Sequence, residues 1–495
     1  MRRVPLLSGS RVVLVPVGED DVVLRAPPEP TQIVDVAAAV RDALRYPLSG
    51  PPLDALATRG GRATIVVEPA AMPLPGAPQD ARQTAIAVAI AELERYGVPD
   101  ERQTLLVAGG LGRRFGQPDL ERVLPPPQAR GFHGRVVVHD VEDEELVPVA
   151  EGVRVNRALV ETDLVLTVTA AESVVHGGPG ALIAASDAHT VRAVAGADSL
   201  LEAGGSPAWS LALRIESALA ERVSVAGVSL VLDLPRLTGR YRGYPDDEAV
   251  VARIASSPLR AAFTLLPDSF RSDLLARQGR RMTATGAFAG RPSVAHAEAL
   301  LRGVARRGVR LDEPVDALVV GVPWIGPHIP REPLNPITTA AVALGLALRL
   351  RRDAFPVREG GTLVVVHPLT RSFAHVTQAP YAAAFDVLRG LQSPDELLRA
   401  ELATAADERA LTAYRAGRAC HPLLPYADWA GCAPALGRLG RVVVAGSRDS
   451  LAARTLGFVP THGIGSALEM AHGVAEGRAR LGILLAPPYA PLLVG

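Results

Sequence analysis

The chain has 495 residues, 48% of them hydrophobic and 21% charged, so it exceeds the usual size of one hydrophobic core and is too apolar for a disordered protein. Its 52 basic and 52 acidic residues cancel, and no long block of one charge occurs, which disfavours nucleic acid and anionic membranes as partners. The sequence contains no lysine. Mechanisms that need a lysine amine for a Schiff base, an amide-linked cofactor or a P-loop phosphate contact are therefore excluded.

Other compositional features indicate a cytoplasmic protein. Two cysteines, Cys420 and Cys432, are too few for a disulfide scaffold or a four-sulfur metal site, and we expect both to be buried. Polar residues 8–11 interrupt the N-terminal segment, which does not resemble a signal peptide. The most apolar stretch, residues 340–348, has about half the length that a membrane-spanning helix needs. We therefore predict no membrane anchor.

The first half of the chain repeats a short β-branched run, a glycine- or proline-rich turn and an alanine- and leucine-rich segment, which predicts an α/β fold. Residues 81–96 are the clearest helix, with Gly97 placed to end it. Because the strands read as continuous apolar runs, we predict mainly parallel sheets with helices on both faces. The predicted strands are residues 11–17, 64–67, 104–107, 135–138, 164–168 and 225–232.

The second half follows the same pattern after a segment, residues 249–310, whose composition predicts helices and which is rich in arginine. We place a boundary near Arg310, which gives an N-terminal domain of residues 1–310 and a C-terminal domain of residues 311–495. A site is expected in the cleft between them. Predicted strands are residues 317–322, 362–366, 441–444 and 481–485, and predicted helices are residues 337–350, 394–415, 451–456 and 465–474.

A glycine loop follows the strand at 104–107. In a parallel sheet, ligands bind at the carboxyl ends of strands. Gly110 and Gly112 would let the backbone approach an anion, and Arg113 and Arg114 would neutralise a phosphate or carboxylate. The loop is neither a dinucleotide fingerprint nor a Walker loop. The alternative interpretation is a tight turn with solvated arginines.

A second candidate loop follows the strand at 164–168. It places Glu172, His176 and Gly178 before an apolar segment, which combines an acid, a base and a glycine-rich helix entrance. We predict His176 as a general base, oriented by Glu68 from the end of the strand at 64–67, with Glu172 as a further catalytic residue. The alternatives are a connection whose histidine caps a carbonyl, and a solvated loop glutamate at position 68.

Three residues of the second half are further ligand-binding candidates. Trp324 and His328 follow the strand at 317–322, and Asn335 precedes the helix at 337–350. A structural role explains each second-half histidine equally well. No zinc protease, serine hydrolase or calcium-binding pattern occurs, so the sequence does not indicate which metal, if any, is bound.

Several segments together resemble the nickel-dependent lactate racemase family. They are residues 64–75, 95–101, 108–114, 139–140 and 155–165, followed by 359–366 and 456–471. The resemblance implies two α/β domains with the active site in the cleft between them. It also implies a nickel-pincer nucleotide tethered through a lysine, a nickel-binding histidine, and two histidines that move the hydroxyl proton while a hydride passes to the cofactor. Such an enzyme racemises a 2-hydroxy acid.

The sequence departs from that family at most of its chemical positions. By this resemblance, the two catalytic histidines correspond to Gly112 and Val174, the tethering lysine to a position near Ala184, and the nickel-binding histidine to one near Ala195. Glu68 keeps one family carboxylate. The substrate-binding arginine corresponds to residue 71 or 72, an alanine and a methionine.

These losses predict altered chemistry on the inherited scaffold. Losing a proton-transfer group typically lowers a rate by about 10²- to 10⁴-fold. We therefore expect a lactate-racemase-like protein that acts on a small anionic molecule, an isomerase if it is active, without a lysine-tethered nickel-pincer cofactor. The alternative is a non-catalytic protein that binds a small ligand or a partner on the same scaffold.

Overall fold

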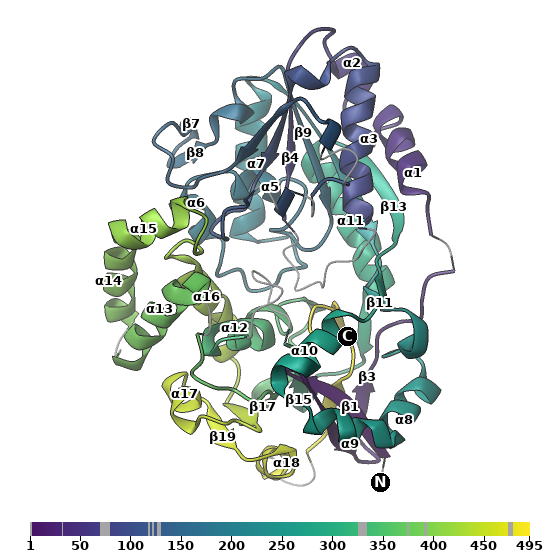
Figure 1. Ribbon diagram of the computed structural model, residues 1–495, viewed down its shortest axis with the longest axis vertical. Helices are drawn as coiled ribbons and strands as arrows, with labels where there is room; N and C mark the ends of the chain where they lie inside the picture. Colours follow the sequence, from purple (N-terminus) through teal and green to yellow (C-terminus); the bar gives the residue numbers. More distant parts are fainter. Residues whose placement is uncertain are drawn as a thin grey trace.

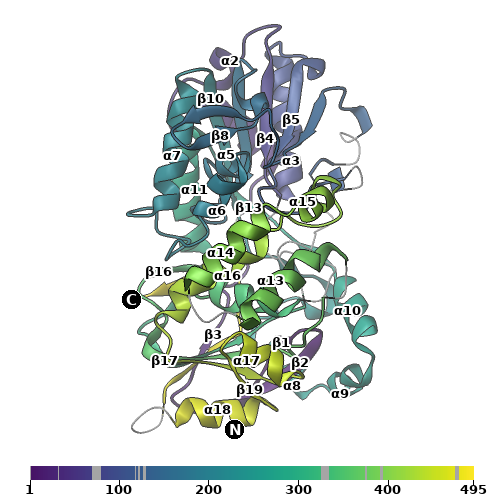
Figure 2. The same ribbon diagram turned by 90° about the vertical axis from the view of Figure 1, so that its left-hand side faces the viewer.

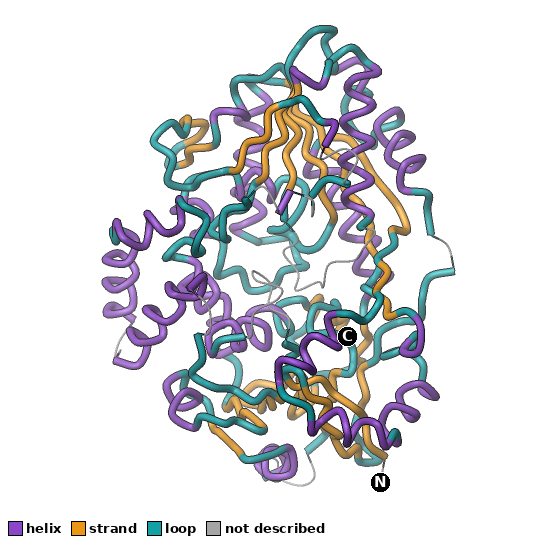
Figure 3. Tube along the Cα trace, viewed as in Figure 1, coloured by secondary structure: helices purple, strands orange, loops and turns teal. Residues whose placement is uncertain are grey.

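The fold is a mixed α/β arrangement with two six-stranded sheets, one toward each end of the molecule (Figures 1 and 3). This confirms the predicted fold class. The computed structural model describes residues 2–31, 33–69, 80–116, 119–120, 123–125, 130–324, 334–373, 376–390, 394–473 and 479–495. No helix in these ranges is both long enough and apolar enough to cross a membrane.

The first sheet has the strand order β13-β10-β9-β4-β5-β6, and β13 alone runs antiparallel to its neighbour. Every residue of β4 and β9 is buried, because helices cover both faces. The strands are β4 (Ala63–Val67), β5 (Gln103–Val107), β6 (Arg135–Val138), β9 (Leu164–Ala170), β10 (Ser224–Leu232) and β13 (Ala284–Gly290). The strands predicted between residues 64 and 232 are all present. Strand β13 lies in the segment whose composition indicates helices, so that expectation is wrong for these residues.

Alternate residues of the first sheet face different helices. Ile65 and Leu105 pack with α1 and α3, whereas Val66 and Leu106 pack with α5 and α7. Aspartate and serine side chains cap several of these helices, including Asp80 at α3 and Ser206 at α7. The helices are α1 (Val36–Arg45), α2 (Leu53–Leu56), α3 (Ala81–Arg95), α5 (Gly180–Ala184), α6 (Ala188–Ala193), α7 (Pro207–Ala220), α8 (Glu248–Ser256), α9 (Pro258–Leu265), α10 (Asp268–Ala276) and α11 (Pro292–Arg307).

The second sheet is parallel throughout, in the order β19-β18-β17-β15-β20-β3. One face packs against α12, α13 and α16, and the other packs against α18 and the β1–β2 hairpin. The strands are β3 (Val22–Leu24), β15 (Val315–Gly321), β17 (Val357–Val366), β18 (Arg441–Ala445), β19 (Val459–Thr461) and β20 (Leu481–Leu484). All four strands predicted in this half are present.

The helices of the second half differ from the sequence prediction in four places. The expected helix at 337–350 is a short α-helix followed by a π-helical stretch, and the one at 394–415 is divided where Asp407 caps a new helix. Helices α13 and α16 were not expected. The elements are α12 (Pro336–Ala340), η5 (Ala341–Leu346), α13 (Ala379–Gly390), α14 (Pro394–Ala405), α15 (Glu408–Arg415), α16 (Leu424–Leu436), α17 (Ser450–Thr455) and α18 (Ile464–His472).

Short strands and 3-10 turns complete the fold. The small sheets pair β1 (Arg2–Ser8) with β2 (Arg11–Val17), β7 (Val147–Ala150) with β8 (Val153–Val155), β11 (Arg236–Leu237) with β12 (Arg280–Arg281), and β14 (Val309–Leu311) and β16 (Arg351–Asp353) with β21 (Leu492–Val494). The 3-10 turns are η1 (Asp100–Arg102), η3 (Arg157–Leu159), η4 (Gly239–Tyr241) and η6 (Val376–Gln378). The strand predicted at 11–17 is therefore part of an antiparallel hairpin.

The first residues of the chain belong to the second sheet. Strand β3 pairs with β20, and the β1–β2 hairpin packs beneath β15 and β17. The segment after β11 also returns there, since the Tyr244 hydroxyl donates to the Pro5 carbonyl at 3.0 Å. The division into residues 1–310 and 311–495 stays a prediction, but the strand pairing does not follow it at the N-terminal end.

Truncating Leu24 tests this arrangement. Leu24 is 1% exposed and shares a core with Leu484 and Val320. We expect Leu24→Ala to lower the free energy of unfolding by about 2–5 kcal/mol, because a buried leucine loses its contacts and leaves a cavity. Amide hydrogen exchange should accelerate in β20 and remain unchanged in β4. Leu48→Ala, at a position 50% exposed, is the control. Faster exchange in β4 alone would contradict the arrangement.

Candidate functional site

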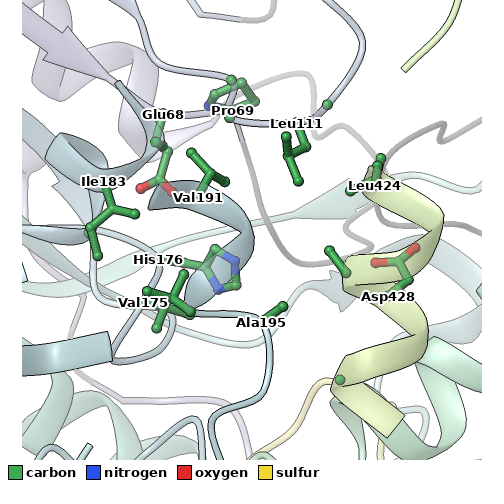
Figure 4. A pocket seen from close by; sticks show the side chains of 18 of the residues that line it. Glu68, Pro69, Leu111, Val175, His176, Ile183, Val191, Ala195, Leu424 and Asp428 are labelled. Atoms are coloured by element: carbon green, nitrogen blue, oxygen red, sulfur yellow. The ribbon is translucent and has the colours of Figure 1, made fainter. Parts of the chain in front are cut away.

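A cavity of about 280 Å³ has walls from both halves of the chain. The first half contributes the ends of β4 and β5, residues 175–176 and helices α5 and α6, and the second half contributes η5, Arg349 and α16. Figure 4 shows Glu68 and His176 on one side and Asp428 on the other. In Figure 2, α14 to α16 lie between the two sheets. The halves therefore face each other across this cavity.

The glycine loop forms one wall but does not present the amides that the sequence led us to expect. Gly110 and Gly112 both line the cavity. The Gly110 N–H donates to the Ala184 carbonyl at 3.1 Å, and the Gly112 N–H donates to the Gly109 carbonyl at 3.0 Å. Gly110 has φ +51°, a conformation that favours glycine. These two glycines therefore shape the wall, and their amides are already bonded.

The two arginines of this loop are paired with carboxylates. Arg113 lines the cavity, and its Nη2 lies 2.8 Å from Asp119 Oδ2. Arg114 is not among the lining residues. Its guanidinium lies 3.3 Å from Asp140 and donates to the Arg415 carbonyl at 2.8 Å, which ties the loop to α15. The structure thus gives both guanidinium groups a structural partner in place of the expected anion.

His176 lines the cavity and is held by a serine. Its Nδ1 lies 2.8 Å from Ser173 Oγ, a contact that orients the imidazole ring. The Ser173 carbonyl in turn lies 2.8 Å from His296 Nε2, and the Ser229 hydroxyl lies 3.2 Å from His296 Nδ1. Burial lowers the pKa of His296 to about 4, so its ring is neutral at pH 7. The neutral ring donates from Nε2 to Ser173 and accepts at Nδ1 from Ser229.

Glu68 binds the backbone next to His176. Its Oε2 accepts from the Gly177 N–H at 2.7 Å, while the imidazole Nδ1 is bonded to Ser173. The hydrogen bond that orients the ring thus comes from Ser173, and Glu68 fixes the following residue. Burial, with a smaller contribution from Glu172, raises the pKa of Glu68 to about 8. The Glu68 carboxyl is therefore largely protonated at pH 7, and it lines the cavity.

Glu172 and Gly178 lie behind the cavity wall and are not among its lining residues. Glu172 is 4% exposed and pairs with Arg82 Nη1 at 2.9 Å. The Gly178 N–H donates to Thr169 Oγ1 at 2.7 Å, and a Cβ there would lie 2.3 Å from His296 Cβ. Both residues therefore hold the loop in place, where the sequence had indicated direct contact with a ligand.

Two of the three second-half candidates, Trp324 and Asn335, do not line the cavity either. Trp324 is buried, and the Asn335 Oδ1 accepts from the Thr338 N–H at 3.0 Å, so Asn335 is the N-cap of α12. His328 lies outside the described residues. The sequence analysis placed Asn335 among the ligand-binding candidates, whereas its side chain caps helix α12 in the structure.

Two residues that line the cavity were not among the site residues predicted from the sequence. Arg349 follows η5, and Asp428 lies on α16, where its Oδ2 accepts from the Tyr381 hydroxyl at 2.6 Å. A signal for Asp428 was present, because it is the one acidic or arginine residue between Arg418 and Arg438 in an otherwise apolar segment. A carboxylate there needs a buried partner or a functional role.

Polar contacts hold the two halves together around the cavity. His421 Nε2 lies 3.0 Å from Glu142 Oε1, and the His421 N–H donates to the Leu111 carbonyl at 2.9 Å. Arg192 Nη2 donates to Glu401 Oε2 at 2.9 Å.

His139 is a buried histidine of the first half: its ring lies 2.8 Å from the Ser186 carbonyl, and burial lowers its pKa to about 4. These contacts make His421 and His139 structural.

The lining residues do not fit the nickel-pincer nucleotide that the resemblance implies. The chain has no lysine to tether it, and Ala184 and Ala195, where the resemblance places the tether and the nickel-binding histidine, line the cavity with methyl groups. Val174, at the position of one catalytic histidine, is fully buried. Within the described ranges, no three histidine, cysteine or acidic side chains are grouped to bind a metal ion.

Comparison with known proteins identifies the N-terminal part of the chain. Residues 9–177 match the lactate racemase N-terminal domain. The resemblance to the lactate racemase family is confirmed over these residues. No curated protein matches the sequence.

Solved structures extend the likeness of fold to the whole chain. The lactate racemase apoprotein from Thermoanaerobacterium thermosaccharolyticum is similar with a TM-score of 0.61 and 13% identity, covering 100% of both chains. A protein from Thermotoga maritima is similar with a TM-score of 0.50 and 12% identity, covering 93% of this chain and 97% of that one. At these identities, the two structures establish a shared fold.

Removing the Ser173 hydroxyl tests how His176 is held. We expect Ser173→Ala to change the tautomer and the pKa of His176, because its Nδ1 loses its hydrogen-bond partner. Nitrogen-15 NMR of the histidine side chains measures both. Ser199→Ala is the matched control, since the Ser199 hydroxyl donates to the Arg351 carbonyl and does not contact His176. Unchanged His176 signals in Ser173→Ala would refute the contact.

Replacing Glu68 by its neutral isostere should change the pH dependence of stability. The folded state binds a proton at Glu68 up to about pH 8, whereas an ordinary glutamate releases it near 4.5. The contribution of the Glu68 carboxyl to the free energy of unfolding is therefore largest below pH 4.5 and is lost as the pH rises toward 8. We expect Glu68→Gln to become more stable relative to the wild type across this range, by about 1 kcal/mol or more. Urea unfolding at several pH values measures the difference, and a constant difference would contradict the raised pKa.

Proposed function

We propose that this cavity is a diverged lactate-racemase-like active site in which His176 moves a proton of a small anionic substrate, with chemistry of the 2-hydroxy-acid isomerase type. The proposed reaction does not use a lysine-tethered nickel-pincer nucleotide. Its main support is one observation: His176 and Glu68 meet Asp428 and Arg349 in a single cavity between the two halves of the chain.

The residues at three positions where the resemblance implies catalytic or cofactor-binding side chains also support this cavity as the active site. Gly112, Ala184 and Ala195, which stand where the resemblance places a histidine, a lysine and a histidine, all line this cavity. Each has a side chain of one carbon or none. Their small size leaves space that the larger family side chains would fill, and the resulting 280 Å³ lies near the lower end of small-molecule sites, roughly 300–1,000 Å³. The site therefore suits a small ligand.

The remaining side chains can perform proton transfer. With Nδ1 of His176 bonded to Ser173, its Nε2 is the atom that takes or returns a proton. The Glu68 carboxyl, protonated at pH 7, can donate a hydrogen bond to a substrate oxygen that gains negative charge. In this reaction His176 Nε2 would take the C2 proton, and the electron pair of the broken C–H bond would stay on the substrate as a planar enediolate. A solvent proton added to the opposite face would restore the C–H bond while His176 releases its proton to the solvent, without a net change of atoms or electrons.

Isotope exchange tests the proposal. Enantiopure 2-hydroxy carboxylates of two to four carbons are incubated with the protein in D₂O, and proton NMR follows loss of the C2–H signal, while chiral chromatography follows inversion. We expect His176→Ala to lower turnover by about 10²- to 10⁴-fold, the usual contribution of a general base. His133→Ala is the control for loss of a histidine away from the cavity, because the His133 side chain is 72% exposed and pairs with Asp100.

Two outcomes would contradict the proposal. Unchanged turnover in His176→Ala would remove the assigned role. Nickel and sulfur in stoichiometric amounts on the purified protein, with loss of turnover when nickel is removed, would show that the family cofactor acts here after all. Tight binding of a carboxylate without turnover would favour the alternative function, a non-catalytic ligand-binding protein on the same scaffold.

A further inference from the structure

We propose that Arg349 binds the anionic group of the ligand in this cavity, and that this group is a carboxylate. The inference deepens the proposed function and rests on it, because it names the residue and the ligand chemistry of the same site. Neither arginine of the glycine loop has this role, since Arg113 is paired with Asp119 and Arg114 with Asp140.

Arg349 is a buried cation without a carboxylate at ion-pairing distance among the described residues. It is 6% exposed, and burial lowers its pKa to about 10, so it remains charged at pH 7. Asp198 raises this pKa through its charge, but that carboxylate is bound by Arg351 at 2.5 Å and Arg438 at 3.2 Å. A buried charge is costly unless a counter-charge compensates it. An anionic ligand in the adjoining cavity would supply that counter-charge.

The guanidinium sits in a cradle built around it. Its Nε donates to the Ala197 carbonyl at 2.6 Å and its Nη1 to the Gly345 carbonyl at 3.2 Å. A Cβ at Gly431 would lie 2.7 Å from Nη1, so an alanine at this point of α16 would displace the end of the Arg349 side chain. These two hydrogen bonds use two of the five N–H donors of an arginine and leave three for the two oxygens of a carboxylate.

Other buried arginines either pair with an acid or lie away from the cavity. Arg236 and Arg271 are buried but each pairs with an aspartate three residues away. Arg307 is 5% exposed and donates to carbonyls of Gly303 and Ala171, yet it does not line the cavity. Arg349 is the lining arginine that has no carboxylate at ion-pairing distance among the described residues.

The other charges of the cavity favour a monoanion. Glu68 and Asp428 are both in the wall, and a phosphate dianion would be repelled by the Asp428 carboxylate and would meet one unpaired guanidinium. A carboxylate carries a single charge that Arg349 alone can balance. Arg349 lies in the second half and His176 in the first, so a hydroxy acid held by its carboxylate would place its remaining atoms between the two halves.

Calorimetric titration tests the assignment. The probes are acetate, glycolate and both enantiomers of lactate, with glycolamide and lactamide as neutral counterparts and inorganic phosphate as the alternative anion. We expect the wild type to bind at least one of the carboxylates and to bind neither its amide nor phosphate comparably. Arg349→Gln should weaken carboxylate binding by about 10- to 100-fold, the usual value of a hydrogen-bonded charge pair.

Matched variants separate binding from folding. Arg113→Gln removes the paired arginine of the same cavity, and Arg307→Gln removes a buried arginine elsewhere, so both should bind within twofold of the wild type if they fold. Arg349→Lys should recover part of the affinity. Gly431→Ala keeps the guanidinium but places a methyl group against its Nη1. This variant should weaken binding, and it tests the role of Arg349 even if Arg349→Gln does not fold.

Each outcome decides the inference. Unchanged affinity in Arg349→Gln and Gly431→Ala would overturn the role of Arg349 while leaving the proposed reaction intact. Binding of phosphate in place of carboxylates would overturn the ligand class, and absence of binding by every probe would overturn the inference as a whole. Carboxylate binding that depends on Arg349, together with unchanged turnover in His176→Ala, would refute the proposed reaction and support the inference.

Discussion

The site depends on the tight packing of the chain between β9 and α5 against helix α11. Gly177 and Gly178 adopt φ of +98° and +54°, and a Cβ on either would collide with the Ala170 carbonyl or with His296. The buried, neutral His296 accepts from Ser229 and donates to Ser173, and Ser173 bonds the ring of His176. A line of buried hydrogen bonds thus runs from the first sheet to the histidine of the cavity. A buried polar network of this kind fixes one geometry because each of its members would be costly to leave unpaired.

The residues of the cavity beside this loop can be compared with the site that the family resemblance implies. The resemblance places the tether near Ala184, the nickel ligand near Ala195 and one catalytic histidine at Gly112, all small residues of the cavity wall, while His176 stands two residues after the buried Val174. Residues 9–177 match the lactate racemase N-terminal domain, and the fold likeness covers the whole chain. A fold preserves the location of a site better than it preserves the chemistry, because location follows from topology and chemistry from a few side chains.

Removal from water affects the charges of Arg349 and Glu68 in the cavity differently. Arg349 remains cationic with two carbonyl contacts, whereas Glu68 holds its proton near neutral pH because desolvation in the cavity wall and the charge of Glu172 favour the neutral carboxyl. Electrostatic interactions in such a low-dielectric space are stronger than in water, so a small ligand would experience a pronounced field between the two halves. The contacts of His421 with Glu142 and of Arg192 with Glu401 join the halves at the cavity rim.

Local patterns in the sequence were enough to predict the fold class, most strands and the loops that line the cavity, because apolar periodicity and glycine-rich turns are local properties of the chain. It also excluded a lysine tether, since composition needs no coordinates. Tertiary structure alone decided which charges are already paired: Arg113 meets Asp119, Arg114 meets Asp140, Glu172 meets Arg82, and Asn335 caps its own helix. It also brought Arg349 and Asp428 to the cavity and carried β3 into the second sheet. These pairings join residues far apart in the chain or depend on the direction of a side chain, and neither is encoded in a local pattern.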